Sequence, residues 1–335
     1  MISAGIFGAS GYTGAELLRL CAGHPEIDVV LATGDSTAGS AVGDLYPSLA
    51  GAYADLVVVE PDPASAEGLD LVFLALPHGA SQAVVPDLRK RVGKIVDLAA
   101  DFRLRDPSLY PTWYGAPHTA PELLSEFAFG IPELFRDDLR GADMVAAAGC
   151  YVTAAALALA PLVRAGAIET QGVIVDAASG ASGAGKVPRP ASHFATVDGD
   201  FTAYGLLTHR HTPEIEQATG ATVVFTPHLA PMTRGILATC YARPTSDTDP
   251  VEVLRDFYAG EPFVHVSDRS PSTKATAGSN CAHITARRDA RTGWVLVLCA
   301  LDNLVKGASG QALQCANLAL GLDETAGLPL MGLYP

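Results

Sequence analysis

One cysteine in this 335-residue chain has surroundings suited to covalent chemistry. Cys150 follows the apolar run 144–148, which reads as a strand broken at Gly149, and precedes a stretch that becomes helical from about Val152. Ligands gather at the carboxyl ends of strands in open α/β sheets, and a helix N-terminus favours the nucleophilic thiolate. The alternative is an ordinary buried cysteine. Its position makes Cys150 the candidate nucleophile.

A cysteine nucleophile requires a partner that carries protons, and the segment LTHRHTPEI offers two histidines. His209 and His211 flank Arg210, and in an extended chain both rings would face the same side. Two histidines could also ligate a metal, but no third ligand is placed with them, so the sequence predicts no metal site. The alternative for at least one of the pair is a structural, hydrogen-bonded role.

The N-terminal segment predicts a dinucleotide site. ISAGIF is typical of a strand, and TGAELLRLCAGH carries apolar residues at helical spacing. The junction GASGYTG is a GxxGxxG pattern, whose glycines let the backbone turn tightly beside a pyrophosphate at the start of a helix. Thr13 and Glu16 also fit a capping box. The alternative is a purely structural turn; the predicted contacts are Gly8, Ser10, Gly11, Tyr12, Thr13 and Gly14.

The residues after the second predicted strand, 28–33, bear on which dinucleotide is bound. Asp35 could accept hydrogen bonds from an adenosine ribose, which favours NAD. The neighbouring Ser36, Thr37 and Gly39 could instead hold the 2′-phosphate of NADP. The residues alone leave the two cofactors equally supported.

Two further segments could bind an anion. SGASGAGK, residues 179–186, follows a predicted strand and offers hydroxyls, backbone amides and a lysine, so it is either an anion-binding nest or a flexible turn. Arg103, in DFRLRD, follows another strand end, where its guanidinium could hold a phosphate or carboxylate. A surface salt bridge explains Arg103 equally well.

Composition limits the partners and the location. The net charge of −14 provides no basic face for nucleic acid, and an anionic substrate would need a local group of cations. The six cysteines form no CxxC pair, which argues against a zinc ribbon and a disulfide framework and favours a reducing compartment. MISAGIFG lacks the pattern of a secretory signal, so we expect a cytoplasmic protein.

The uncharged stretch 144–163 is long enough to cross a bilayer. A strand, a turn at Gly149 and a buried helix explain the same residues, because the first part continues the rhythm of the preceding strands. We therefore expect no membrane span.

The order of elements predicts two domains. Short apolar runs alternate with helical stretches such as AVVPDLRKRV in the first half, which indicates a Rossmann-type parallel sheet. The second half contains several strand-like runs separated by loops, which indicates an α+β domain with a mostly antiparallel sheet. We expect a dinucleotide-binding domain of residues 1–149 and 306–335, and a catalytic and oligomerisation domain of residues 150–305.

These motifs together resemble a known family. GASGYTGAE, ALPHGAS, DLAADFR, AAGCYVT, SGASGAGK, HRHTPEI and NLVKGASGQALQ are similar, in the same order and over almost the whole chain, to the N-acetyl-γ-glutamyl-phosphate reductases of arginine biosynthesis. The resemblance implies the fold of aspartate-semialdehyde dehydrogenase and NADPH-dependent reduction of an acyl phosphate to an aldehyde. It also implies a homo-oligomer, a dimer or tetramer, with a C-terminal helix that begins near Lys306 and packs on the nucleotide domain.

The resemblance assigns roles residue by residue. Cys150 matches the nucleophile and His211 the acid/base residue. The substrate pocket matches Arg103, Ser179, Gly180, Ser182 and His209. Pro77 of ALPHGAS, Ser36 and Asn303 join the glycine turn as expected cofactor contacts.

Three positions depart from the family pattern. Val152 replaces the usual proline after the tyrosine of GCYPT, which alters how the helix begins, and Lys186 replaces an arginine. Asp35 lies near the expected 2′-phosphate site. Three alternatives stay open: a carrier-linked aminoadipyl-phosphate reductase of lysine biosynthesis, a Cys/His hydrolase or amidotransferase, and a nucleotide-sensing regulator without catalysis.

Overall fold

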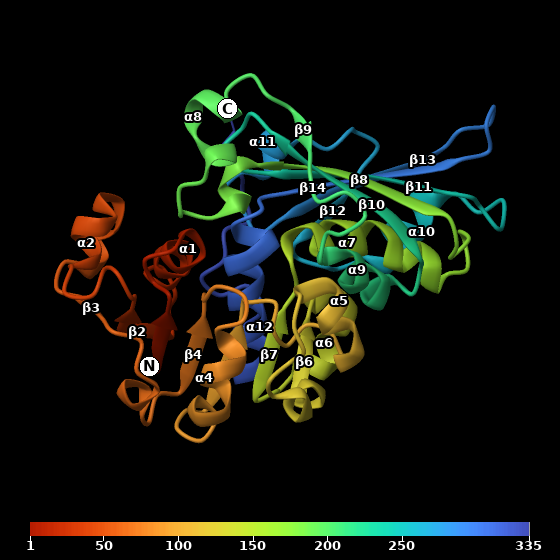
Figure 1. The fold of residues 1–335 in the computed structure, drawn as a ribbon. Helices are drawn as coiled ribbons and strands as arrows, with labels where there is room; N and C mark the ends of the chain where they lie inside the picture. The colour runs from red at the N-terminus through yellow and green to blue at the C-terminus, as the bar shows by residue number, and fades with distance from the viewer. Residues whose placement is uncertain (335) are drawn as a thin grey trace. The chain divides into compact units, whose positions relative to one another are not determined.

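The chain forms two compact units in the computed structural model, which describes residues 1–334 (Figure 1). The first unit contains Met1–Ala148 and Ala308–Leu328. The second contains Gly149–Gly307 and the described residues from 329 onward. The tail thus leaves the first unit, because the Asn280 amide donates to the Pro329 carbonyl at 2.8 Å and the Leu333 amide to the Ala277 carbonyl at 2.8 Å.

The first unit is built on a parallel sheet of seven strands in the order β3-β2-β1-β4-β5-β7-β6. Strands such as β4 and β7 are buried at every residue, which explains their continuous apolar runs. The order reverses between β1 and β4, where ligands bind in open α/β sheets. The strands are β1 Ile2–Phe7, β2 Ile27–Thr33, β3 Val58–Val59, β4 Leu71–Leu74, β5 Lys94–Asp97, β6 Phe127–Gly130 and β7 Met144–Ala147.

Helices connect these strands and a late helix completes the unit. Helix α12 (Gly310–Leu320) packs against α1, α6 and strands β5, β6 and β7, and nearly all of its residues are buried. It follows a π-helical turn, Val305–Ser309. The other helices are α1 Tyr12–Cys21, α2 Val42–Leu45, α3 Ala50–Tyr53, α4 Ser81–Leu88, α5 Tyr110–Tyr114 and α6 Pro132–Leu139.

The second unit is built on a mixed, mostly antiparallel sheet of seven strands in the order β12-β13-β14-β11-β8-β10-β9. Burial alternates along β8 and β11, so one face of the sheet is covered and the other is half-exposed. The strands are β8 Val173–Gly180, β9 Thr202–Ala203, β10 Val223–Ala230, β11 Ile236–Ala242, β12 Val264–Val266, β13 Ala282–Arg288 and β14 Val295–Leu301. The expected fold class, a Rossmann-type sheet with a mostly antiparallel second sheet, is confirmed.

Three helices cover one face of the second sheet: α7 (Cys150–Arg164) contacts β11 and β14, α9 (His211–Thr219) contacts β10, and α10 (Pro250–Phe257) contacts β13 (Figure 1). The short helices α8 (Phe194–Val197) and α11 (Thr273–Thr276) lie in the connections. Helix α7 is buried throughout its middle, which accounts for the uncharged stretch 144–163. Between residues 1 and 334, no helix has the length and apolar character needed to span a bilayer.

Two local expectations are wrong. Helix α7 begins at Cys150 and not near Val152, with Gly149 in extended conformation as its N-cap. Helix α1 begins at Tyr12, so Thr13 and Glu16 do not form a capping box. Glu16 is buried instead and binds Arg19 at 2.6 Å.

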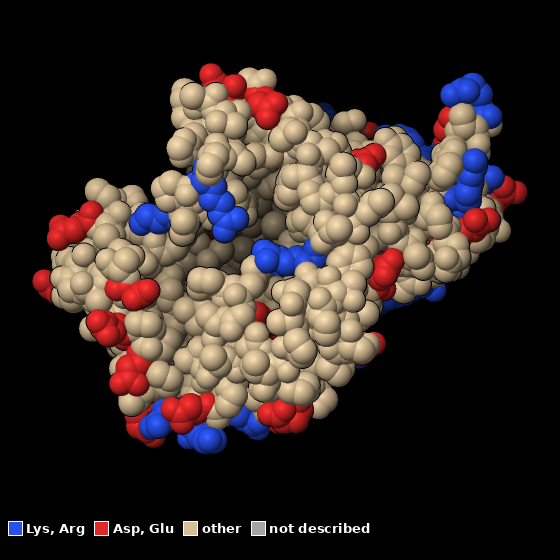
Figure 2. Space-filling model, viewed as in Figure 1, with Lys and Arg blue, Asp and Glu red and all other residues tan. Residues whose placement is uncertain are grey.

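Charges are dispersed over the face drawn in Figure 2. Lysine and arginine side chains lie there in small groups, aspartate and glutamate side chains are scattered between them, and most of the face carries neither. An anionic ligand would therefore be bound by a few local cations.

Candidate active site

The glycine turn after β1 has the geometry of a dinucleotide-binding loop. Gly8 has φ +88°, and a Cβ at Gly14 would lie 2.3 Å from the Gly8 carbonyl oxygen. The Gly8 and Ala9 amides donate to the Thr33 carbonyl at 3.1 and 2.8 Å, which ties the turn to the end of β2. Only glycine allows helix α1 to begin this close to the strand, with its first amides directed at the turn.

The turn after β2 lies beside this loop. A Cβ at Gly34 would lie 2.9 Å from the Ser10 hydroxyl and 2.6 Å from the Thr37 hydroxyl. Asp35 and Ser36, which follow Gly34, are both exposed. The carboxylate that would bind a ribose and the hydroxyls that would bind a 2′-phosphate therefore occupy the same short turn.

Pro77 and Arg103 lie on the loops after β4 and β5. Pro77 is exposed, whereas Arg103 is 6% exposed and donates to the Leu98 carbonyl at 2.6 Å. Its burial excludes the surface salt bridge as an explanation of Arg103. This donated bond makes Arg103 part of the turn that follows β5.

Cys150 is the first residue of α7, and two contacts fix the turn that carries it. The buried Glu214 side chain accepts a hydrogen bond from the Gly149 amide at 3.2 Å, and a Cβ at Gly307 would lie 2.8 Å from the Cys150 Cβ. The first intrahelical bond of α7 runs from Thr153 to Gly149, so the amides of residues 150–152 precede it. Backbone amides in the first turn of a helix can stabilise an oxyanion.

The two histidines lie together, but not as expected. His211 begins α9 and Arg210 is helical, so the segment is not extended. The His209 Nδ1 accepts a hydrogen bond from the His211 amide at 3.2 Å, and the ring centroids are 4.7 Å apart. The Tyr151 ring, next to Cys150, contacts both, with centroids 5.8 Å from His209 and 5.9 Å from His211. Helix geometry thus brings both imidazoles to the start of α7.

The surroundings of the two histidines change the pKa values of His209 and of the nearby Tyr204. Burial, followed by the charge of Arg210, lowers the pKa of His209 to about 4, so its imidazole is neutral at neutral pH. Burial raises the pKa of Tyr204 to about 12, and its hydroxyl donates to the Tyr151 hydroxyl at 3.1 Å. His209 is therefore a neutral hydrogen-bonding group beside His211.

The glycine-rich loop after β8 is pinned to the 232–235 turn. A Cβ at Gly180 would lie 2.8 Å from the Arg234 nitrogen, and the Ser182 amide donates to the Thr233 carbonyl at 3.1 Å. The amides of residues 180, 181, 182 and 185 are all hydrogen-bonded within the protein. The expectation that they are free donors is therefore wrong for these four. Ser179 is 2% exposed and Ser182 is 9% exposed. These four amides are therefore engaged within the protein, and the role of the loop in anion binding stays a prediction.

Asn303 holds the same loop. Its side-chain nitrogen donates to the Ser182 hydroxyl at 2.9 Å, and its side-chain oxygen accepts from the Gly235 amide at 2.8 Å. The expected contact between Asn303 and a dinucleotide remains a prediction.

Two residues that the sequence analysis missed belong with these groups. Glu214 is fully buried, three residues after His211 on α9, and its spacing from the histidine was the available signal. Arg234 forms an ion pair with the fully buried Asp302 at 3.1 Å, and Asp302 also accepts amide bonds from Gly278 and Leu304. Nothing local in PMTRG indicates that Arg234 would meet Asp302.

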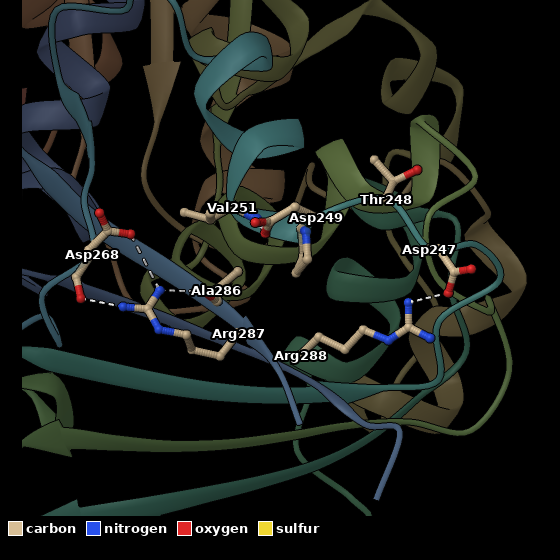
Figure 3. Close-up of a pocket in the computed structure, with 9 residues that line it drawn as sticks. Asp247, Thr248, Asp249, Val251, Asp268, Ala286, Arg287 and Arg288 are labelled. Carbon is tan, nitrogen blue, oxygen red and sulfur yellow. Dashed lines mark hydrogen bonds and ion pairs between the residues drawn. The ribbon is translucent and has the colours of Figure 1, made fainter. Parts of the chain in front are cut away.

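No cluster of three or more metal-binding side chains occurs within residues 1–334. A cavity of about 560 Å³ in the second unit has none of the expected site residues in its lining (Figure 3). Arg288 and Arg287 at its rim pair with Asp247 at 2.8 Å and with Asp268 at 3.7 Å. These ion pairs are substantially exposed and contribute little to stability.

Comparison with known families agrees with this architecture. A family model described as "Semialdehyde dehydrogenase, NAD binding domain" matches residues 3–142, and one described as "Semialdehyde dehydrogenase, dimerisation domain" matches residues 150–303. The chain therefore belongs to the semialdehyde dehydrogenase family, and it is an oxidoreductase with an NAD(P)-binding domain.

Full-length relatives define the branch of this family. The chain is 50% identical, over 100% of both chains, to an N-acetyl-gamma-glutamyl-phosphate reductase from Desulforudis audaxviator. It is also 50% identical, over 100% of its length and 99% of the relative, to one from Symbiobacterium thermophilum. Within the semialdehyde dehydrogenases, the chain belongs to the N-acetyl-gamma-glutamyl-phosphate reductases, as the motifs indicated.

Solved structures share the fold. The aspartate semialdehyde dehydrogenase II of Vibrio cholerae superposes with a TM-score of 0.73 at 15% identity, covering 96% of this chain and 98% of that one. The enzyme from Candida albicans, solved with NADP, gives a TM-score of 0.65 at 15% identity over 95% of this chain and 98% of that one. At this identity the likeness extends to the fold alone.

Proposed function

We propose that this enzyme reduces N-acetyl-γ-glutamyl phosphate to N-acetylglutamate semialdehyde with NADPH. The observation that carries the proposal is the placement of Cys150 at the first position of α7, with Tyr151 in contact with both His209 and His211. The relatives named for this reductase match the chain from end to end.

Cys150 is the nucleophile in this proposal. Its thiolate attacks the γ-carbonyl carbon, the carbon–sulfur bond forms, and the bond to the phosphate oxygen breaks, which releases inorganic phosphate and leaves a thioester. The amides of residues 150–152 stabilise the oxyanion of the tetrahedral intermediate. Glu214 positions this turn through the Gly149 amide, and its role is therefore indirect.

His211 carries the protons. It accepts the thiol proton before attack. After hydride transfer the oxyanion of the thiohemiacetal collapses to the aldehyde, the carbon–sulfur bond breaks, and His211 returns the proton to the departing sulfur. His209, neutral at the working pH, orients His211 by accepting its backbone amide. The two histidines therefore have different roles.

Arg234 binds the phosphate group of the substrate. Asp302 holds its guanidinium group in place, and the side chain is 30% exposed, so a bound phosphate can contact the guanidinium. Because the amides of residues 180–182 are already hydrogen-bonded, we assign the anion contacts to side chains. The Ser182 hydroxyl and Lys186 supplement Arg234, and Arg103 stays a predicted substrate contact on its motif alone.

The first unit fits a bound dinucleotide, since Gly8 and Gly14 leave a backbone cradle that a Cβ would fill. When bound, the reduced nicotinamide supplies the hydride that reduces the thioester. Ser10, Gly11, Tyr12 and Thr13 contact the pyrophosphate, and Pro77 the nicotinamide end. We assign NADPH because the Thr37 and Ser10 hydroxyls both lie beside Gly34 and the next residues, Asp35 and Ser36, are exposed, so that Asp35 can turn away.

Two properties of the whole protein complete the proposal. A homo-oligomer forms through the half-exposed face of the second sheet, in the part that matches the dimerisation domain. The described cysteines form no disulfide, which suits a reducing compartment, and we therefore place the enzyme in the cytoplasm.

The reverse reaction tests the function directly. Purified protein is supplied with N-acetylglutamate semialdehyde, phosphate and NADP or NAD, and formation of reduced nicotinamide is followed by absorbance. We expect phosphate-dependent reduction of NADP. Preference for NAD would reverse the cofactor assignment and implicate Asp35. Activity with an aminoadipyl semialdehyde on its carrier, but not with the N-acetylglutamate derivative, would contradict the substrate assignment.

A further inference from the structure

The first unit contains a buried serine between two buried aspartates. The Ser81 hydroxyl lies 2.8 Å from the Asp97 Oδ2 and 2.9 Å from the Asp101 Oδ2. Ser81 and Asp97 are fully buried, and Asp101 is 3% exposed. A serine hydroxyl carries one proton and can donate to only one of the two oxygens. The second short contact therefore requires a proton on one of the carboxyl groups.

Hydrogen bonds from backbone amides decide which aspartate holds this proton. Asp101 accepts from the Gly79 amide at 2.7 Å and the Gln82 amide at 3.0 Å, whereas Asp97 accepts only from the Ala99 amide, at 2.9 Å, among the backbone bonds of the described residues. A carboxylate that accepts more hydrogen bonds is better stabilised in its charged form. Asp101 is therefore the ionised partner, and Asp97 donates to Ser81, which donates to Asp101.

The surroundings of Asp97 agree with this order. Burial raises the pKa of Asp97 to about 7, and the charge of Asp101 adds to the rise while that of Arg103 opposes it. Two histidines lie on the same loops. The His78 Nδ1 accepts a hydrogen bond from the Ala100 amide at 3.0 Å, so this nitrogen carries no proton. Burial lowers the pKa of His118, which favours its neutral form. Arg103 is thus the one cation among the groups that act on Asp97 in the described chain.

The three side chains connect the carboxyl ends of two neighbouring strands. Ser81 and the amides of Gly79 and Gln82 belong to the loop and helix start that follow β4, Asp97 is the last residue of β5, and Asp101 lies in the turn after it. The first loop carries Pro77, the expected contact of the dinucleotide. A link between these loops therefore acts on the cofactor site.

We propose that Asp97 and Asp101 share one proton through Ser81, and that this proton holds the 77–82 loop in the conformation that binds the nicotinamide dinucleotide. Asp97, Ser81 and Asp101 are positioning residues, because they act through the loop. The proposal rests on the proposed function, since it assumes that the loop contacts the dinucleotide. When the proton leaves, Ser81 faces two carboxylates, its contact with Asp97 becomes repulsive, and the loop loses this hydrogen bond to β5 while the bonds to Asp101 remain.

Titration of dinucleotide binding tests the positioning role. The Kd for NADPH is measured by fluorescence from about pH 6 to pH 8 in the wild type and in Asp97→Asn, which keeps the shape and the donated bond of the neutral acid. We expect the wild-type Kd to rise roughly tenfold over this range, the effect of about one lost buried hydrogen bond, and the Asp97→Asn Kd to stay near the acid value. The comparison cancels the titration of the dinucleotide's own phosphates.

Two further variants serve as controls. Asp87→Asn removes the same charge from the surface of α4 and should keep the wild-type profile. Ser81→Ala removes the bridge and should raise the Kd already at acid pH. Identical profiles in the wild type and Asp97→Asn would overturn the proposal.

An infrared titration reports the proton without any ligand. The wild type should show a protonated carboxyl band that disappears as the pH rises through neutrality, and Asp97→Asn should lack it. Absence of the band in the wild type would refute the shared proton. If no nicotinamide dinucleotide bound at any pH, the proposed function would fail, and the infrared titration alone would decide on the proton.

Discussion

Removal of the Cys150 sulfur should stop the reaction and leave the rest of the protein intact. Cys150→Ala removes the only atom that forms the thioester, so we expect turnover below detection, while the Kd for NADPH and the melting temperature change little. Cys281→Ala removes a thiol elsewhere in the second unit and should keep its activity. Substantial turnover by Cys150→Ala would refute a covalent mechanism.

The role of the Arg234 guanidinium in phosphate binding can be tested, because the reverse reaction uses phosphate and semialdehyde as separate substrates. Arg234→Lys keeps the charge but loses the planar pair of donors and the ion pair geometry with Asp302, so we expect the KM for phosphate to rise about tenfold with little change for the semialdehyde. Arg287→Lys, at an exposed ion pair, is the matched control. A rise confined to the KM of the semialdehyde would mean that Arg234 binds the substrate carboxylate.

At the scale of elements, the turn between β1 and α1 depends on one close approach. A Cβ at Gly14 would lie 2.3 Å from the Gly8 carbonyl oxygen and 2.6 Å from the Ala9 Cα, whereas at Gly11 the nearest atom is 3.5 Å away. Gly14→Ala should therefore destabilise the ligand-free protein by about 1–3 kcal/mol, and Gly11→Ala should not. Thermal unfolding without cofactor measures both variants, and equal stability of the two would show that the turn relaxes freely.

We expect the subunits to contact one another through the half-exposed face of the second sheet. Val224, Ile174, Tyr241 and Leu296 pair in register across four strands and form an apolar row, beside a cavity of about 430 Å³. We expect sedimentation to show an oligomer that Ile174→Asp and Val224→Asp dissociate, because a charge in the row would be desolvated on association. Val30→Asp, at a similarly exposed valine of β2, is the control. A monomeric wild type would contradict the interface.

Across the whole molecule, the half-buried His209 and the buried Asp97 make the free energy of unfolding depend on pH with opposite signs. The pKa of His209 is lowered from 6.5 to about 4, so the unfolded state binds more protons as the pH falls through this window and stability is lost toward acid. The pKa of Asp97 is raised from 3.8 to about 7, so the folded state binds more protons than the unfolded state between these two pH values. The free energy of unfolding therefore falls as the pH rises through this range.

Calorimetry from about pH 4.5 to pH 8 separates these contributions. His209→Asn should reduce the fall in melting temperature on the acid side, and Asp97→Asn should raise the melting temperature most at pH 8. Each variant is compared with Asp87→Asn, which changes an exposed charge. Parallel curves for all three variants would mean that neither group titrates as described.

Features that depend on neighbours in the chain can be predicted from the amino-acid sequence. The glycines of GASGYTG, the strand-to-helix junction at Cys150 and the alternation of strands and helices all follow from local patterns, because a turn or a helix start is set by a few adjacent residues. The predicted start of α7, near Val152, lies two residues after the observed start at Cys150, because Gly149 is the N-cap.

Contacts between groups that are distant in the chain depend on the three-dimensional fold. Glu214 reaches the Gly149 amide, Asp302 holds Arg234, and the loop amides of residues 180–182 are occupied by the 232–235 turn, none of which a local pattern encodes. The link from Ser81 to Asp97 and Asp101 likewise depends on the adjacency of β4 and β5. Buried polar groups must find partners, and the fold alone determines which ones come within reach.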